Sequence, residues 1–226
     1  MPRIKAMQEQ GAARVRPLVV ITGGSSGIGR STAKAFAAEG HPLLLISRRI
    51  EPLPELGADR VIFEQADVVD YQGIVVAVRK AEKEFGTTGC LVNNAGVVDA
   101  RDFRDIYYES YSHEIDVNLK GVLNCTKAVL GRMIANRAGT IINISSVSDR
   151  KTSPVAVAYT ATKYAVRDAS CWVIRILWSR INWLKSFCTA GNCRLISVFA
   201  IWSSLPPKPV SRRSKAPRIA SLSGDP

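Results

Sequence analysis

The stretch "LVVITGGSSGIGRSTAKAFAAEG" at residues 18–40 sets an apolar strand, a glycine-rich turn and a helix-forming segment in direct succession. The turn holds three glycines, Gly23, Gly27 and Gly29, with the spacing G-x-x-x-G-x-G. Glycine permits positive φ and lets the backbone approach a ligand closely. The N-terminus of the following helix presents unpaired N–H groups and a positive dipole end to an anion. The stretch therefore predicts a phosphate-binding loop, with the hydroxyls of Ser25 and Ser26 as further donors. A plain Gly-Ser turn is the alternative.

The alternation of strand and helix continues along the chain. Runs that are apolar nearly throughout occur at 18–22, 42–47, 60–67, 90–94 and 140–145. Such runs suit strands that are covered on both faces of a parallel sheet. Amphipathic stretches lie between them at 28–39, 71–85 and 112–136, and Gly40, Gly86 and Gly139 stand where helix C-caps are expected. The pattern predicts a Rossmann-like, doubly wound α/β fold with helices on both faces and a crevice beyond the carboxyl ends of the strands.

The end of the second strand indicates which dinucleotide the crevice accepts. In folds of this kind, an acid at this point binds the ribose 2′-hydroxyl of NAD, whereas arginine suits the 2′-phosphate of NADP. Here the strand ends in Ser47, Arg48 and Arg49, with no acid before Glu51. Guanidinium groups bind phosphate through paired, charge-assisted hydrogen bonds. The sequence therefore favours NADP, with two arginines that merely solvate a loop as the alternative.

A phenol and an ammonium stand four positions apart in "YTATK" at residues 159–163. On a helix, positions i and i+4 share one face, so Lys163 can stand beside the Tyr159 ring. An unperturbed tyrosine has a pKa of about 10, which is too high for easy proton exchange at neutral pH. A nearby ammonium stabilises the phenolate and lowers that value. The spacing is therefore typical of an acid/base pair, although it is also common by chance.

Four motifs occur in one order: "TGGSSGIG", "NNAG" at 93–96, "NISS" at 143–146 and "YTATK". In this arrangement the chain resembles the short-chain dehydrogenase/reductase family over about residues 16–170, and its NADP-dependent members most. The resemblance implies reversible hydride transfer between NADP(H) and a small alcohol/carbonyl substrate, with hydroxy acids among the candidates. It also implies a homodimer or homotetramer that uses the helices expected at 112–136 and 159–170.

The resemblance further implies a catalytic group of Asn118, Ser146, Tyr159 and Lys163. Tyr159 is the acid/base, Lys163 lowers its pKa, Ser146 holds the substrate oxygen, and Asn118 holds a water in a proton relay. Ser146 is preferred to Ser145 because it lies 13 residues before Tyr159, the usual interval in the family. For Asn118, a solvent-facing or capping amide is the alternative.

The residues implied for the cofactor come from the carboxyl ends of successive strands. They are Gly23, Ser25, Ser26, Gly27, Ile28, Gly29, Ser47, Arg48, Arg49, Asp67, Val68, Asn94, Ala95, Gly96, Tyr159 and Lys163. Asp67 is expected near the adenine, and Asn94, Ala95 and Gly96 are expected to line the cleft.

Composition limits the other classes of function. The 226 residues are 46% hydrophobic, which is enough for one substantial core. No apolar run reaches the roughly 18 residues of a membrane span, and no secretory signal precedes Leu18, so we expect a cytoplasmic protein without membrane contact. The five cysteines contain no Cys-x-x-Cys pair, which argues against a zinc site or a disulfide framework. Residues 1–170 carry a net charge of only +4 of the total +12, so the body of the chain does not predict nucleic-acid binding.

After Ser170 the sequence changes character. Residues 171–226 contain all four tryptophans and a single acid, Asp225, and lack the Pro-Gly turn expected of the family. The expected organisation is an N-terminal extension at 1–15, a dinucleotide-binding and catalytic domain at 16–170, a divergent segment at 171–205 and a disordered basic tail at 206–226. Residues 194–202 are a candidate for an added strand, so the C-terminal part of the sheet is expected to be atypical or incomplete.

Three interpretations of this segment stay open. It is a frame-shifted or alternatively spliced end, an unusual substrate or dimer segment, or a basic aromatic arm that binds an anionic surface. Under the first, the protein is a catalytically impaired NADP-binding variant that acts as a non-enzymatic or regulatory partner.

Overall fold

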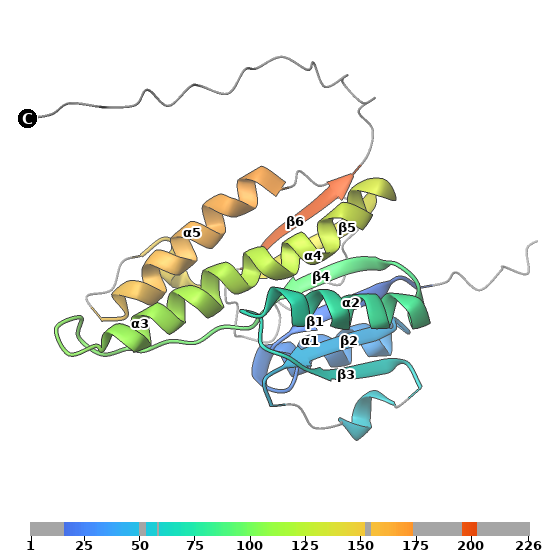
Figure 1. Ribbon diagram of the computed structural model, residues 1–226, viewed down its shortest axis with the longest axis horizontal. Coiled ribbons are helices and arrows are strands. Elements are labelled where there is room, and N and C mark those ends of the chain that lie inside the picture. The colour runs from blue at the N-terminus through green and yellow to red at the C-terminus, as the bar shows by residue number, and fades with distance from the viewer. Residues whose placement is uncertain (1–15, 50–52, 58, 152–154, 174–195, 203–226) are drawn as a thin grey trace, which may run out of the picture.

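The computed structural model describes residues 16–49, 53–57, 59–151, 155–173 and 196–202. Its core is a six-stranded sheet in the order β3-β2-β1-β4-β5-β6 (Figure 1). The strands are β1 Leu18–Thr22, β2 Leu43–Ser47, β3 Val61–Gln65, β4 Thr88–Asn93, β5 Ala138–Ile144 and β6 Ile196–Trp202. The helices are α1 Gly27–Ala38, α2 Tyr71–Phe85, α3 Tyr108–Ile115, α4 Gly121–Ala135 and α5 Val157–Val173. Strands β1 to β5 pair in parallel, so the predicted Rossmann-like fold is confirmed.

The two faces of the sheet bury alternate residues of the same strands. Val20 and Leu91 pack with residues of α2 and α4 on one face. Val19 and Val92 pack with Ala33 and Phe36 of α1 on the other face. Because successive strand residues point to opposite faces, a strand that is covered on both sides must be apolar throughout. This explains why "LVVIT" and "LLLIS" do not alternate with polar residues.

The strand order changes direction beside β1. The chain moves from β1 to β2 and β3 on one side, and then crosses to β4 and β5 on the other. A sheet of this kind opens a crevice at that switch point, outside the carboxyl ends of the strands. The segments that follow β1, β2, β3, β4 and β5 therefore converge at one edge of the sheet.

The long helix expected at 112–136 is interrupted. Helix α3 ends at Ile115, a π-helical turn covers Asp116–Lys120, and α4 then begins at Gly121. A π turn inserts an extra residue into the helix and is frequent at functional sites. Asn118 lies in this turn and points inward, with 1% of its surface exposed. The alternative of a solvent-facing Asn118 is therefore wrong.

One expected helix cap is wrong. Gly40 and Gly86 have φ of 77° and 86° at the ends of α1 and α2, as predicted. Gly139 instead lies inside β5, and α4 ends at Asn136 with the positive φ of 51° at Arg137. A Cβ at Gly139 would lie 2.5 Å from Cγ of Met133, so this glycine is required by close packing of helix on strand.

The C-terminal edge of the sheet is atypical, as expected from the sequence. Strand β6 pairs with β5 antiparallel, from Ala138 opposite Trp202 to Ile144 opposite Ile196. Helix α5 continues past residue 170 as far as Val173. The extension at 1–15 and the tail at 206–226 lie outside the described residues. No described helix is long and apolar enough to cross a membrane.

Candidate active site

A cleft of about 590 Å³ lies at the carboxyl ends of the parallel strands. Its lining includes residues from the turns after β1 to β4 and from α5. Among those predicted from the sequence, it is lined by Gly23, Ser25, Ser26, Gly27, Ile28, Ser47, Arg48, Arg49, Asp67, Val68, Asn94, Ala95, Gly96, Tyr159 and Lys163. Gly29, Asn118 and Ser146 are not among the lining residues and stand behind or beside the cleft.

The turn after β1 has the geometry of an anion cradle. Gly23 and Gly27 have φ of 65° and 52°, in the left-handed region that favours glycine. A Cβ at Gly27 would meet no atom within 4 Å, so the absence of a side chain there leaves the cleft open. Helix α1 begins at Gly27, and the Ser26 side chain makes no capping hydrogen bond. The N–H groups of the first turn lack intrahelical partners, so the loop fits a pyrophosphate.

Gly29 supports the cradle from behind. A Cβ on this residue would overlap the carbonyl oxygen of Gly23 and lie 2.6 Å from Nδ2 of Asn94. The same Asn94 amide donates to the carbonyl oxygens of Thr22 and Gly23, both at 3.0 Å. The role of Gly29 is therefore close packing, whereas Gly27 leaves space for a ligand.

Thr22 was not predicted from the sequence. It is 1% exposed, and its hydroxyl accepts from the N–H groups of Asn94 and Ala95, both at 3.1 Å. These bonds tie the end of β1 to the segment that follows β4. Its position as the last strand residue before the glycines is a signal that could have identified it.

Beyond β2, the cleft is lined by one hydroxyl and two exposed guanidinium groups. The hydroxyls of Ser25 and Ser47 lie 3.0 Å apart, which joins the glycine loop to the end of β2. Arg48 donates from Nη1 to Nε2 of His113 on α3 at 3.2 Å. Arg48 and Arg49 thus stand at the rim where the sequence predicts the adenosine ribose.

Hydrogen bonds fix the turn after β3 and join it to α4. Oδ1 of Asp67 accepts from the N–H of Val69 at 3.1 Å. The side-chain amide of Asn124 on α4 donates to the carbonyl oxygen of Val68 at 3.0 Å. Val68 is 6% exposed and packs in the core on the α2–α4 face. Asp67 and Val68 of this turn line the cleft.

Asn118 joins two walls of the cleft. Its Oδ1 accepts from the N–H of Val97 at 2.8 Å, and its Nδ2 donates to the carbonyl oxygen of Val97 at 2.8 Å. Nδ2 also lies 3.3 Å from Oγ1 of Thr162 on α5. The amide therefore links the segment after β4 to the helix that carries Tyr159 and Lys163. Its role in a proton relay remains a prediction.

Lys163 and Tyr159 lie together on α5. The Nζ of Lys163 stands 5.5 Å from the centroid of the Tyr159 ring and donates to the carbonyl oxygen of Ile144 at 2.8 Å. Lys163 is 7% exposed, and burial lowers its pKa from the ordinary 10.5 to about 8. The charge of Asp149 opposes that fall. A buried amino group is therefore held beside the phenol.

The two serines after β5 have different partners. The Ser145 hydroxyl donates to Oδ2 of Asp149 at 2.6 Å, and both residues are buried. The Ser146 hydroxyl accepts from the N–H of Ser148 at 3.3 Å and caps the 3₁₀ turn Val147–Asp149. Ser145 is among the residues that line the cleft and Ser146 is not, so the choice of Ser146 for the substrate oxygen stays a prediction. Asp149 was not predicted, because nothing in "SVSDR" indicates that an acid there is buried.

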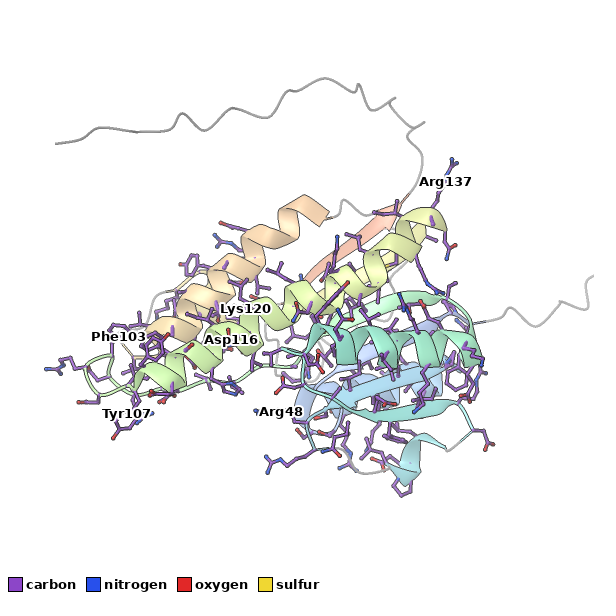
Figure 2. All side chains as sticks on the ribbon, viewed as in Figure 1. Arg48, Phe103, Tyr107, Asp116, Lys120 and Arg137 are labelled. Carbon is purple, nitrogen blue, oxygen red and sulfur yellow. The ribbon has the colours of Figure 1, made fainter. Side chains whose placement is uncertain are left out.

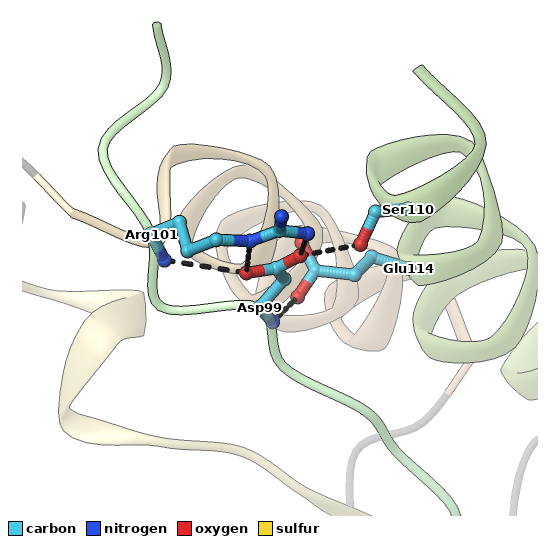
Figure 3. Close-up of polar contacts among 4 residues, drawn as sticks. All are labelled: Asp99, Arg101, Ser110 and Glu114. Carbon is cyan, nitrogen blue, oxygen red and sulfur yellow. Dashed lines mark hydrogen bonds and ion pairs between the residues drawn. The ribbon is translucent and has the colours of Figure 1, made fainter. Parts of the chain in front are cut away.

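A polar cluster beside the cleft joins the loop after β4 to α3 (Figure 3). The carboxylate of Asp99 accepts from the guanidinium of Arg101 and from the Ser110 hydroxyl, and Arg101 holds the pKa of Asp99 below its usual range. Glu114 accepts from the N–H of Asp99 and is 2% exposed. Burial raises the pKa of Glu114, while the N–H groups of Asp99 and Tyr159 favour its ionised form. This cluster, which joins the loop after β4 to α3, was not predicted from the sequence.

A comparison with known protein families identifies the family of this chain. The family model described as short chain dehydrogenase matches residues 17–171. The chain belongs to the short-chain dehydrogenase/reductase family. The match ends two residues before the end of α5, and so it covers the parallel strands and every residue of the predicted site.

Several relatives of this short-chain dehydrogenase resemble it over the same region. The oxidoreductase UcpA of Salmonella typhimurium is 42% identical over 153 residues, which cover 65% of this chain and 58% of that protein. The crystal structure of serine dehydrogenase from Escherichia coli is 32% identical, with a TM-score of 0.64, over 68% of this chain and 73% of that one. The structure described as ElxO with NADP bound is 30% identical, with a TM-score of 0.64, over 68% of this chain and 65% of that one.

The relatives are longer than the matched region. The chain spans 58% to 63% of the length of the first curated relatives that it matches. The matched part of the chain holds the glycine loop and the Tyr159–Lys163 pair. The activity and partners of the whole protein are therefore matters for proposal.

Proposed function

We propose that the chain is an NADP-dependent oxidoreductase that transfers a hydride between the nicotinamide and a small alcohol/carbonyl substrate. The observation that carries the proposal is one continuous cleft with the glycine loop, Arg48 and Arg49 at one end and Tyr159 with Lys163 at the other. A cleft that joins these two groups of residues suits a dinucleotide whose phosphates rest on α1 and whose redox ring faces the phenol. The bound NADP in the ElxO structure supports the choice of cofactor.

The residues divide the chemistry between them. When bound, NADPH supplies the hydride for the carbonyl carbon. The Tyr159 hydroxyl gives its proton to the carbonyl oxygen, so that hydride and proton together make the alcohol. The Lys163 ammonium, buried beside the ring, stabilises the phenolate that remains. Ser146 donates a hydrogen bond to the substrate oxygen and holds it for transfer.

The substrate and assembly belong to the same proposal. Hydroxy acids are one substrate class to test, since the related Escherichia coli structure is described as a serine dehydrogenase. Self-association into a dimer or tetramer through α4 is supported by Leu123 and Ile134, which are 50% and 59% exposed on that helix. Light scattering on the full chain tests the assembly. A cytoplasmic location remains a prediction from the sequence.

Thermal unfolding of the full chain, titrated with NADPH and with NADH, tests the cofactor. A ligand that binds only the folded state raises the unfolding temperature, and we expect NADPH to do so at lower concentration than NADH. No shift with either dinucleotide contradicts the proposal. A shift by NADPH without turnover of any aldehyde, ketone or keto acid supports the impaired variant instead.

Oxidation of NADPH by the Tyr159→Phe variant tests the catalytic role. We expect kcat to fall by about 10² to 10⁴, the usual contribution of a general acid, with the shift by NADPH unchanged. Tyr164→Phe is the matched control, because that ring stacks on Arg167 at 4.8 Å and is not among the lining residues. Equal turnover in Tyr159→Phe and the unmodified enzyme rejects the assignment.

A further inference from the structure

An imidazole stands beside the arginine that is proposed to bind the 2′-phosphate. Nη1 of Arg48 donates to Nε2 of His113 at 3.2 Å, although the two residues are 65 positions apart in the chain. Arg48 follows β2, at the carboxyl edge of the strands (Figure 2), and His113 lies in the last turn of α3. Both side chains are exposed. The rim of the cleft is therefore built from two separate elements at this point.

The contact with Arg48 places His113 at the rim of the cleft. His113 comes four residues before Val117, which lines the cleft from the π turn. Arg48 is itself a lining residue, and its Nη1 donates to the His113 ring. The imidazole therefore contacts a residue of the cleft wall.

The guanidinium remains available to an anion. In the described part of the chain, Arg48 forms no ion pair with a carboxylate, and its hydrogen bond goes to the imidazole. Asp116, three residues after His113, is paired with Lys120 at 2.5 Å. An imidazole acceptor orients the guanidinium without neutralising it. The positive charge is thus kept for a ligand with two or more negative oxygens.

We propose that His113 is a specificity-determining residue that positions Arg48 for the 2′-phosphate of NADP(H). This inference rests on the proposed NADP-dependent function. An exposed arginine loses rotamer freedom when it binds a phosphate. The hydrogen bond to His113 restricts the rotamers of Arg48 before the ligand binds. The entropy that Arg48 loses on binding the phosphate is therefore smaller. NADH carries a hydroxyl at the same position, so its affinity does not depend on the orientation of Arg48.

Dissociation constants of NADPH and NADH, measured by calorimetry on the full chain, test the proposal without any turnover. His113→Ala is expected to weaken NADPH binding about 3- to 10-fold and to change NADH binding less than about twofold, as expected for one lost orienting contact. His113→Gln restores NADPH affinity, because the amide oxygen can accept from Arg48 in place of Nε2. His41→Ala is the matched control, since the other histidine contacts the Pro17 carbonyl oxygen at 2.9 Å and is not among the lining residues.

A second variant separates positioning from a general effect. Arg48→Ala is expected to weaken NADPH binding more than His113→Ala, and the double variant is expected to bind no more weakly than Arg48→Ala alone. Equal loss of NADPH and NADH affinity in His113→Ala overturns the inference, as does full additivity with Arg48→Ala. If the unmodified chain prefers NADPH and His113→Ala leaves that preference intact, only this inference falls. If the unmodified chain binds neither dinucleotide, or prefers NADH, the proposed function falls with it.

Discussion

The two ends of the cleft are built from different materials. At the end formed by β1, β2 and α1, the strands are mostly apolar and buried, and the surface offered to a ligand is glycine backbone with the side chains of exposed or half-buried serines and arginines. At the end formed by the π turn, β5 and α5, the buried residues include polar and charged groups. These are Asn118, Ser145, Asp149, Thr162 and Lys163.

Because of this difference, we expect the two ends of the cleft to tolerate different amino-acid substitutions. The glycine end depends on shape, because a single methyl group at Gly29 would overlap main-chain atoms. The α5 end depends on hydrogen bonds and charge, because each buried polar group there is stable only while it has a partner. Substitutions at each end therefore test whether one end depends on shape and the other on hydrogen bonds and charge.

Gly29→Ala should give the largest effect at the glycine end. The added Cβ overlaps the Gly23 carbonyl oxygen, so the loop must shift at a cost of about 1 to 3 kcal/mol, and NADPH binding should be lost. Thermal unfolding with and without NADPH measures both. Gly131→Ala in α4 is the control, since a Cβ there meets nothing within 4 Å and alanine favours a helix by about 0.5 to 1 kcal/mol. If Gly29→Ala has the stability and the NADPH affinity of the unmodified protein, the glycine end does not depend on shape in this way.

Asn118→Leu should give a loss of stability of similar size at the α5 end. Leucine keeps the branched shape at Cγ but leaves the N–H and carbonyl groups of Val97 without their side-chain partners, at a cost of about 1 to 3 kcal/mol. Urea unfolding measures the change. Asn136→Ala, at the exposed end of α4, is the control and should change the free energy of unfolding by less than about 0.5 kcal/mol. Equal effects of the two variants would mean that the buried amide does not hold the walls together.

Lys163→Met should show a difference that depends on pH. The pKa of Lys163 is lowered in the folded protein to about 8 from 10.5, so between these values the unfolded chain binds more protons than the folded one. The stability of the unmodified protein therefore gains a favourable contribution as pH rises from 8 toward 10.5, whereas the variant lacks that gain. We expect the stability of Lys163→Met, relative to the unmodified protein, to be highest below pH 8 and to fall across that interval.

Chemical unfolding at pH 7, 8, 9 and 10 measures this relative stability. A difference that stays constant with pH would show that burial of the ammonium carries no energetic cost. The glycine end offers a contrast, because Gly29→Ala changes no titrating group and its effect should not depend on pH.

Much of the fold was predictable because it depends on neighbouring residues. The run 18–22 was predicted as a strand with the bounds that β1 has, since a run that is apolar nearly throughout and ends at a glycine turn suits a strand buried on both faces. Gly40 and Gly86 were predicted as helix ends because positive φ is a local property. Gly139 was mistaken for a cap because its requirement comes from Met133, which packs on it across the helix–strand interface.

The site was predictable only in part, for a similar reason. The residues with motif spacing do line or support one cleft, as Arg48, Asn94 and Lys163 illustrate. Asp149 and His113 were missed, because their environment is set by Ser145 and by Arg48 after folding.

The sequence by itself determined the order of strands and helices, the glycine loop and the spacing of Tyr159 and Lys163 on one helical face. These follow from steric freedom and periodicity, which act over a few residues. Only the tertiary structure decided that Lys163 is buried with a lowered pKa, that Asn118 joins two walls, and that His113 meets Arg48. Burial and electrostatic interaction depend on distance in space, and folding brings together groups such as Thr22 and Ala95, which lie 73 positions apart along the chain.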